Sequence, residues 1–288
     1  MPPFDERGAP VAFRMTIAAV TGANQGLGLA LVAGLRARLG SDDVVFLTGR
    51  DPHRVAGAAR GLGDQGLPVE THQLDVTDAA SVDRFAATVD ERGGLDILFS
   101  NAAARIGRER PEAAQVRVFV ATNNRGTTRL LRVLVPRIRP GGRLFVVASS
   151  FGTLRSLPDA RLHVRFDAPD LTLDDIDAAM AGYVDAVEAG RAEAEGWPGW
   201  INIPSKAGQV AAVRVVARDL AAAGTDVFAA AVCPGLVDTD ASRPWFDDMS
   251  EAQSPDAAAA HLVRLALDPV PDAWRGELVQ FGRVLPWR

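Results

Sequence analysis

Segment 15–28 of the 288-residue chain reads MTIAAVTGANQGLG, and the fold class follows from it. Its first part, Met15–Thr21, is a short apolar run that predicts a buried strand. Gly22, Gly26 and Gly28 follow, and the pattern LALVAGLRARL after them is helical. Strand, glycine-rich turn and helix in this order favour phosphate binding, because glycines allow close approach and the helix N-terminus presents free N–H groups. An ordinary glycine loop is the alternative, and the two flanking elements argue against it.

Further apolar runs alternate with helical patterns along the rest of the chain. A long helical stretch is predicted around Gln115–Ile138. The predicted strands are 44–50, 69–76, 95–101, 143–149, 226–232 and 277–281. Strands that are nearly continuously apolar and alternate with helices indicate a parallel sheet covered on both faces. We therefore expect one α/β domain, a doubly wound parallel sheet of Rossmann type over 15–288, after a flexible extension at 1–14.

Composition excludes several classes of function. A hydrophobic fraction of 48% is enough to build a large core, and the net charge of −5 argues against nucleic-acid binding. The single Cys233 excludes an intramolecular disulfide, and four scattered histidines show no metal-ligand spacing. The polar start is unlike a signal peptide, and no apolar run reaches the length of a membrane span. We expect a cytoplasmic protein with a small-molecule substrate.

The end of the second predicted strand bears on cofactor choice. An acidic residue there binds the ribose hydroxyls of NAD, whereas an arginine nearby accommodates the extra phosphate of NADP. Arg50 stands at this point, and Asp51 comes one position too late for the usual acid. The pattern favours NADP(H), with a solvated loop charge as the alternative reading of Arg50.

Lys206 is the only lysine in the chain, and every other residue of the Lys and Arg total is arginine. A GC-rich genome produces such a bias. One interpretation is therefore that Lys206 has no specific role and only escaped this bias. The functional reading is that a compact ammonium is required there, because its pKa can be shifted and arginine cannot replace it.

The motifs together resemble the short-chain dehydrogenase/reductase family from Ile17 to about Val284. TGANQGLG is similar to the TGxxxGxG turn of the family, and SNAA at 100–103 is similar to its NNAG motif. The resemblance implies catalytic roles for Ser150 in VVASS, Asn123 in TNNRGT and Lys206. It implies cofactor contacts for Gly22, Asn24, Gln25, Gly26, Leu27, Gly28, Arg50, Asp75, Val76, Asn101, Ala102, Lys206, Pro234, Gly235, Val237 and Thr239.

Within the family, the chain most resembles the monomeric carbonyl reductases. It shares their long insertion before the active-site helix, here 151–200, with a similar EGWP near its end. Apolar positions from Ile176 to Val187 recur at helical spacing, and in those reductases such a helix covers the surface used for dimerisation elsewhere. The resemblance implies a monomer. Gln25 replaces a lysine that those reductases often carry, which weakens the preference for NADP.

The family pattern Tyr-x-x-x-Lys is broken at its first position, where this chain has Asn202 ahead of Lys206. The tyrosine acts as general acid in the family, but a carboxamide has no proton to give near neutral pH. Ser150 and Asn202 are expected to form a two-donor site for an oxyanion instead. The sole tyrosine, Tyr183, lies in the insertion and is read either as a packing residue or as a substitute acid.

These residues predict an NADPH-dependent reductase of an activated acceptor, such as a quinone, an enone or a polycyclic aromatic ketone. Hydride addition to a quinone or a conjugated enone gives a delocalised, weakly basic oxyanion, and an iminium needs no protonation at all. A non-redox enzyme on the same scaffold and a silent dinucleotide-binding protein are the alternatives. Aromatic residues near the site are candidates for lining a substrate pocket or for ordinary packing, namely Trp197, Trp200, Trp245 and Phe246.

Overall fold

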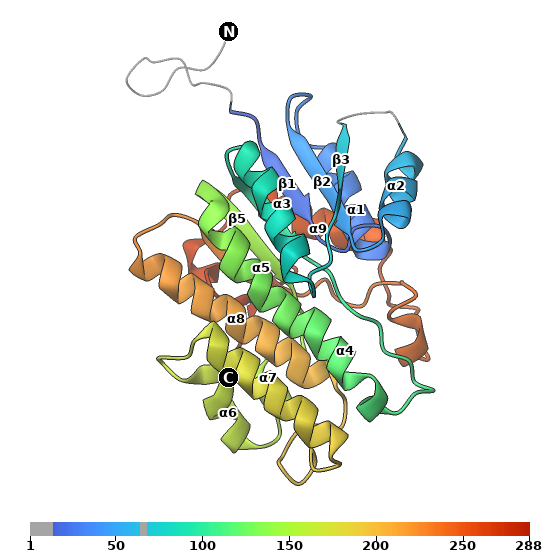
Figure 1. Ribbon diagram of the computed structural model, residues 1–288, viewed down its shortest axis with the longest axis vertical. Coiled ribbons are helices and arrows are strands. Elements are labelled where there is room, and N and C mark those ends of the chain that lie inside the picture. The colour runs from blue at the N-terminus through green and yellow to red at the C-terminus, as the bar shows by residue number, and fades with distance from the viewer. Residues whose placement is uncertain (1–13, 64–67) are drawn as a thin grey trace.

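The computed structural model describes residues 14–63 and 68–288, so the predicted extension lies almost wholly outside the described residues. These residues build one eight-stranded sheet in the order β3-β2-β1-β4-β5-β6-β7-β8 (Figure 1). The strands are β1 (Ile17–Val20), β2 (Val44–Gly49), β3 (Val69–Gln73), β4 (Leu95–Ser100), β5 (Ile138–Val147), β6 (Phe228–Val232), β7 (Leu278–Gln280) and β8 (Arg283–Leu285). The doubly wound fold class is confirmed.

Every strand pair is parallel except the last, in which β8 runs antiparallel to β7 through a tight hairpin. The sequence did not predict β8, because its three residues are only partly apolar. The central strands are fully buried, as in β1 and β2, and this follows from helices covering both faces. Because parallel strands end at the same edge, the loops after β1, β4, β5 and β6 meet at one edge of the sheet.

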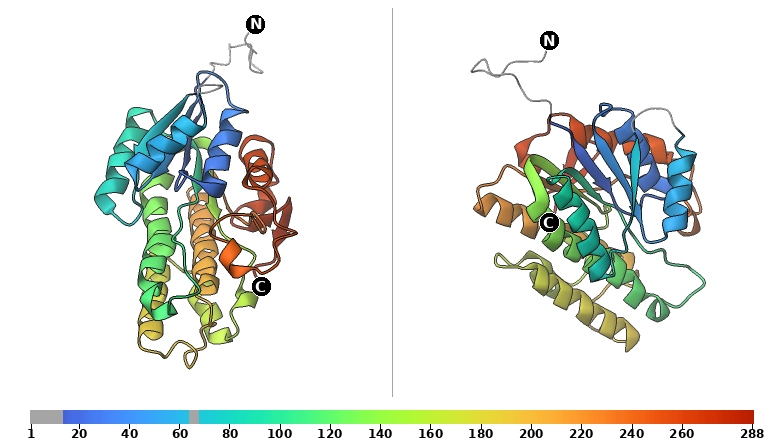
Figure 2. Two further views of the ribbon diagram at one scale, coloured as in Figure 1. Left: turned by 90° about the vertical axis from the view of Figure 1, so that its right-hand side faces the viewer. Right: turned by 45° about the horizontal axis from the view of Figure 1, so that its top comes forward.

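Helices cover both faces of the sheet in two layers. One layer holds α1, α2 and α9, with α9 packed beside α1 (Figure 2), and the other holds α3, α4, α5 and α8. The helices are α1 (Gly26–Arg36), α2 (Pro52–Gly61), α3 (Ala79–Glu91), α4 (Val116–Val120), α5 (Gly126–Leu134), α6 (Ala160–Asp167), α7 (Leu173–Glu188), α8 (Asn202–Ala222) and α9 (Pro255–Leu267). None of the helices described is long and apolar enough to cross a bilayer.

The insertion folds as α6 and α7 and packs outside α4 and α8, at the bottom of Figure 1. Thr172 caps α7 in a reciprocal capping box with Asp175, which satisfies free N–H groups at the helix start. The buried face of α7 carries Met180 and Tyr183, as its helical spacing predicts. Residues after β8 return to the insertion, where the Trp287 indole donates to the Asp167 carboxylate over 2.7 Å.

Candidate active site

The glycine-rich turn between β1 and α1 is packed too closely for larger residues. Gly22 and Gly26 have φ angles of 62° and 53°, in the left-handed region that favours glycine. A Cβ on Gly22 would lie 2.7 Å from the Ala102 Cα, and one on Gly28 would lie 2.5 Å from the Asn101 amide nitrogen. The turn is therefore held against the loop after β4.

Asn101 holds this turn from behind. Its amide nitrogen donates to the carbonyl oxygens of Thr21 and Gly22 at 2.9 and 3.3 Å. The hydroxyl of Thr21 accepts the N–H groups of Asn101 and Ala102, both at 2.9 Å. The structure thus places Asn101 and Ala102 at the predicted site, where their visible role is to fix the phosphate-binding turn.

Two arginines flank the end of β2. Arg50 follows the strand directly, and Arg54 on the first turn of α2 hydrogen-bonds the side-chain oxygen of Gln25 at the start of α1. Asp51 accepts the backbone N–H groups of His53 and Arg54 and so caps α2. The sequence interpretation missed Arg54, although its position four residues after Arg50 on a helix start was a usable signal.

Asp75 lies two residues after the end of β3 at Gln73, although the sequence predicted a strand as far as residue 76. Its carboxylate accepts both the N–H and the hydroxyl of Thr77, at 2.9 and 2.7 Å. The carbonyl oxygen of Val76 accepts from Arg129 at 2.7 Å. Both residues thus sit in a fixed loop at the strand-end edge.

The long helical stretch contains one π turn, Ala121–Arg125, between α4 and α5. Asn123 lies buried in this turn, and its side-chain oxygen accepts the N–H of Ala104 at 2.8 Å. The Thr127 hydroxyl donates to the Asn123 carbonyl oxygen at 2.7 Å. π turns interrupt the regular helical ladder and often occur at functional sites. Here the turn brings Asn123 to the cleft wall.

Lys206 projects from α8 beneath the cleft. Its ammonium donates to the Val147 carbonyl oxygen at 3.0 Å and to the Gln209 side-chain oxygen at 2.8 Å. Gln209 in turn donates to the Thr127 hydroxyl at 3.2 Å, so the hydrogen-bonded chain reaches Asn123. Burial lowers the pKa of Lys206 from 10.5 to about 8, and the neighbouring Cys233 partly opposes this effect. These specific partners argue against the interpretation that Lys206 has no specific role.

Ser150 and Cys233 meet at the ends of β5 and β6. Burial raises the pKa of the Cys233 thiol, while the N–H groups of Gly235 and Ser150, the Lys206 ammonium and the Ser150 hydroxyl oppose the rise. The Gln280 amide also donates to the Cys233 sulfur at 3.2 Å. The sequence interpretation missed Cys233 as a neighbour of the site, although it directly precedes the Pro234-Gly235 motif.

Asn202 is the first residue of α8 and faces the same cleft as Ser150 and Lys206. Its side chain makes no hydrogen bond to any other described residue, so its amide is available to a ligand. Tyr183 is fully buried on α7, with its ring centroid 4.7 Å from that of Trp197, and burial raises its pKa. Tyr183 does not line the cleft, so the substitute-acid reading is wrong and the packing reading holds.

The cleft has a volume of about 390 Å³, and three of the aromatic side chains that line it come from separate segments. Phe151 follows β5, Trp200 precedes α8, and Trp245 belongs to the segment after β6. The Trp200 ring centroid lies 5.1 Å from that of Phe151 and 5.6 Å from that of Trp245. Trp197 instead packs into the core. The cleft also holds predicted residues, namely Leu27, Asn123, Ser150, Asn202, Lys206, Pro234, Gly235, Val237, Thr239 and Phe246.

Across 14–63 and 68–288, no group of three histidine, cysteine, aspartate or glutamate side chains could hold a metal ion.

The remaining predicted residue is Asn24. Its side-chain oxygen lies 3.1 Å from the position that a Cβ on Gly49 would occupy. It therefore lies where the glycine-rich turn approaches the end of β2.

Comparison with known proteins decides the family. The pattern of a family described as short chain dehydrogenase matches residues 16–158. Carbonyl reductase [NADPH] 1 of Homo sapiens is 36% identical over 280 residues, which cover 94% of this chain and 98% of that protein. The chain belongs to the short-chain dehydrogenase/reductase family. The mouse (Mus musculus) protein of the same name is 34% identical over 280 residues, with 94% of this chain and 98% of that protein covered.

Solved structures with a similar fold agree. Salutaridine reductase from Papaver somniferum superposes with a TM-score of 0.78 at 26% identity, covering 91% of this chain and 99% of that one. A menthone neomenthol reductase from Mentha piperita gives 0.76 at 22% identity, covering 93% and 99%, and supports the fold alone. The chain is thus a carbonyl-reductase-like member of the family.

Proposed function

We propose that the protein is an NADPH-dependent reductase of an activated carbonyl-type acceptor, such as a quinone, an enone or a polycyclic aromatic ketone. The supporting observation is Asn202, which faces the cleft beside Ser150 and Lys206 where the family has its acid. A carboxamide donates a hydrogen bond but gives up no proton near neutral pH. Acceptors that form a delocalised oxyanion need hydrogen bonds more than they need an acid.

The residues at the strand-end edge fit a dinucleotide. A Cβ on Gly26 would project toward Thr239, 3.5 Å from its methyl carbon, and would fill the space between α1 and the segment after β6. The start of α1 offers its N–H groups and positive dipole end to a pyrophosphate. Bound NADPH would supply the hydride, and Gly22, Gly26 and Thr239 would help to hold it.

The charges at the end of β2 favour NADPH over NADH. Arg50 and Arg54 bring two guanidinium groups to the place where a ribose phosphate binds in this type of fold. Asp51 is occupied in capping α2, so it does not supply the acid typical of NAD sites. The two carbonyl reductases compared above carry NADPH in their names. Arg54, which contacts Gln25, offers the positive charge that is missing at Gln25 itself.

In the proposed reaction the hydroxyl of Ser150 and the amide of Asn202 hold the substrate oxygen and stabilise the developing negative charge. Lys206 uses two of its three N–H groups on Val147 and Gln209, which leaves one for a ribose hydroxyl or a water. With a pKa of about 8, its ammonium is mostly protonated at neutral pH. Solvent supplies the final proton, since Ser150 is exposed.

The cleft favours a flat, neutral acceptor over a cationic iminium. Phe151, Trp200 and Trp245 offer aromatic surface for stacking. The residues that line the cleft include Arg105 and Lys206 and no carboxylate. A cationic substrate would meet like charge there, whereas an oxyanion product would be stabilised.

The test is the loss of NADPH absorbance with a panel of quinones, enones and simple ketones, beside a separate measurement of NADPH binding. We expect quinones to exceed simple ketones in kcat/KM by about 100-fold or more, the usual scale of a missing general acid. If NADPH binds tightly and no acceptor oxidises it, the reductase proposal fails. The non-redox or silent alternative then takes its place.

We also propose that the protein is a monomer. The insertion helix α7 packs over α4 and α8 and covers part of the surface that those helices would otherwise expose. Its buried face includes Ile176 and Met180 at 0% exposure, so little apolar surface remains there for a partner. Sedimentation equilibrium at micromolar concentration should give the mass of a single chain, and a dimer mass would contradict the proposal.

A further inference from the structure

The two-residue turn between β7 and β8 has an unusual occupant. Phe281 and Gly282 have φ angles of 48° and 74°, the left-handed pair that tight hairpins of this kind need. Asn-Gly and Gly-Gly suit such a turn, whereas a bulky side chain at positive φ is strained. Across the described residues, Phe281 is the one non-glycine with positive φ. Strain of this kind persists where surrounding contacts enforce it and often marks a functional position.

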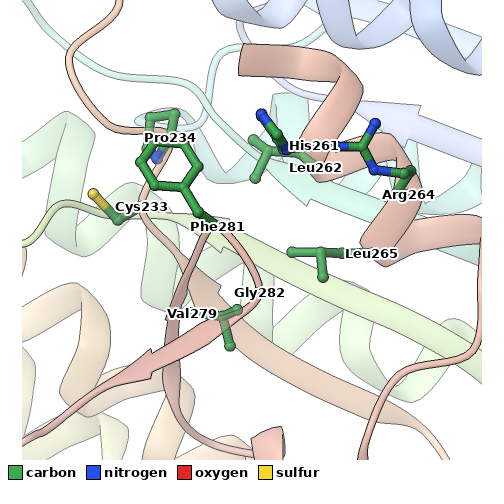
Figure 3. A pocket seen from close by; sticks show the side chains of 9 residues that line it. All are labelled: Cys233, Pro234, His261, Leu262, Arg264, Leu265, Val279, Phe281 and Gly282. Carbon is green, nitrogen blue, oxygen red and sulfur yellow. Dashed lines mark hydrogen bonds between the residues drawn. The ribbon is translucent and has the colours of Figure 1, made fainter. Parts of the chain in front are cut away.

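The Phe281 ring lies against the Pro234–Gly235 turn at the end of β6, and Figure 3 shows the ring close to Pro234. A Cβ on Gly235 would be only 2.7 Å from the Cζ atom of Phe281. The ring also meets the His261 ring of α9 in a T-shaped arrangement, with centroids 5.3 Å apart. Phe281 remains 50% exposed, so burial of its ring in a core does not account for the strained backbone.

The turn also borders a cavity. A cavity of about 330 Å³ lies beside Cys233 and Pro234, bounded by Leu262 of α9, Val279 of β7 and Phe281 itself (Figure 3). Gly235 has a φ angle of 80° and no side chain of its own to restrict it.

The turn is also held by hydrogen bonds. The Gln253 amide nitrogen donates to the Pro234 carbonyl oxygen at 3.0 Å, and its backbone N–H donates to the Leu236 carbonyl oxygen at 2.9 Å. The segment that leads to Thr239 is thus held by Gln253 and contacted at Gly235 by the Phe281 ring.

We propose that Phe281 is a positioning residue that holds the Pro234–Gly235 turn in the conformation that receives the nicotinamide end of the cofactor. The inference rests on the proposed function, because it takes NADPH as the ligand. Phe281 does not line the cleft and acts through Gly235, whereas its neighbour Gln280 reaches the cleft directly.

The test replaces Phe281 by asparagine, which accepts positive φ and creates the favoured Asn-Gly turn. We expect an unchanged or higher Tm, because backbone strain is relieved. We expect the turn to adopt the NADPH-binding conformation only about a tenth of the time in this variant. The Kd for NADPH should then rise about tenfold. The Kd for adenosine 2′,5′-bisphosphate should stay unchanged, because this ligand occupies only the adenosine half of the site.

Arg283→Gln is the matched control, since Arg283 is exposed on the same hairpin and should leave all three values unchanged. Unchanged NADPH affinity in Phe281→Asn would overturn the inference, as would equal weakening of both ligands, which indicates general damage. Phe281→Leu, which keeps an apolar contact and the strain, should bind NADPH more tightly than Phe281→Asn. Binding is measured without an acceptor, so failed turnover refutes only the reductase proposal, whereas absence of NADPH binding in the wild type refutes both.

Discussion

Replacing Lys206 by methionine should stabilise the folded protein while it removes the site's only lysine. Burial lowers the pKa of Lys206 from 10.5 to about 8, and each pKa unit corresponds to about 1.4 kcal/mol. Keeping the buried ammonium charged at pH 7 therefore lowers the free energy of unfolding by about 3 kcal/mol. Methionine fills a similar volume and carries no charge, so this cost disappears.

Part of the gain is lost because two acceptors lose their donor. The Val147 carbonyl oxygen and the Gln209 side-chain oxygen each accept from Lys206, and each loss costs about 1 kcal/mol. The net stabilisation is about 1 kcal/mol, which raises Tm by about 2–4 °C in a chain of this size. Acceptor reduction should fall at least about 100-fold, because the site loses its cation.

The stabilisation should depend on pH with a definite sign. The pKa of Lys206 is lower in the folded state, so between pH 8 and 10.5 the unfolded chain binds more protons and wild-type stability rises with pH. The advantage of Lys206→Met is therefore fully present below pH 8 and is lost as the pH rises toward 10.5. Lys206→Arg, which stays charged, should show no such dependence.

Urea unfolding of the wild type and both variants at pH 7 and pH 10 measures these differences directly. A Lys206→Met protein that is less stable than the wild type at pH 7 would refute the reasoning, because the burial cost would then be absent. An advantage of equal size at both pH values would refute it too, since the stabilisation would come from packing and not from charge.

Three other changes test separate parts of the site and the fold. Asn202→Tyr should raise kcat/KM for a simple ketone by about 100-fold, measured as NADPH consumption, and no gain would show that more than the acid has changed. Arg54→Gln should raise KM for NADPH about tenfold and leave KM for NADH unchanged, since only NADPH carries the ribose phosphate; equal effects on both would contradict the assignment. Thr172→Ala should destabilise the fold by about 1 kcal/mol in urea unfolding through loss of the capping box with Asp175, and an unchanged midpoint would place α7 outside the cooperative unit.

The sequence was most informative where a motif is local. The glycine turn at 22–28, the strand before it and the helix after it are contiguous, so period and turn chemistry were enough to place them. Ser150 follows β5, and the rule that parallel strands end at one edge predicts its place at the site, whereas Asn123 and Lys206 lie within helical segments that this rule does not place. The resemblance to a known family supplied the roles that this geometry alone does not assign.

The remaining features depend on contacts between distant segments. The approach of Arg54 to Gln25 requires the orientation of α2 against α1, and the neighbourhood of Cys233 and Ser150 requires the register of β5 and β6. Neither leaves a local pattern. The third strand ends at Gln73 rather than at Val76, because Asp75 turns its carboxylate back to Thr77 and leaves the sheet.

The contact of Trp287 with Asp167 has a practical consequence for protein engineering. The indole and the Arg288 guanidinium both bind the same carboxylate at the end of α6, and the Leu154 N–H donates to the Trp287 carbonyl oxygen. The insertion is therefore fastened by residues more than a hundred positions away in the chain. A chimera that transplants segment 151–200 into a related enzyme therefore has to include Trp287 and Arg288. Without them, the transplanted segment loses the contacts that hold Asp167 and Leu154 in place.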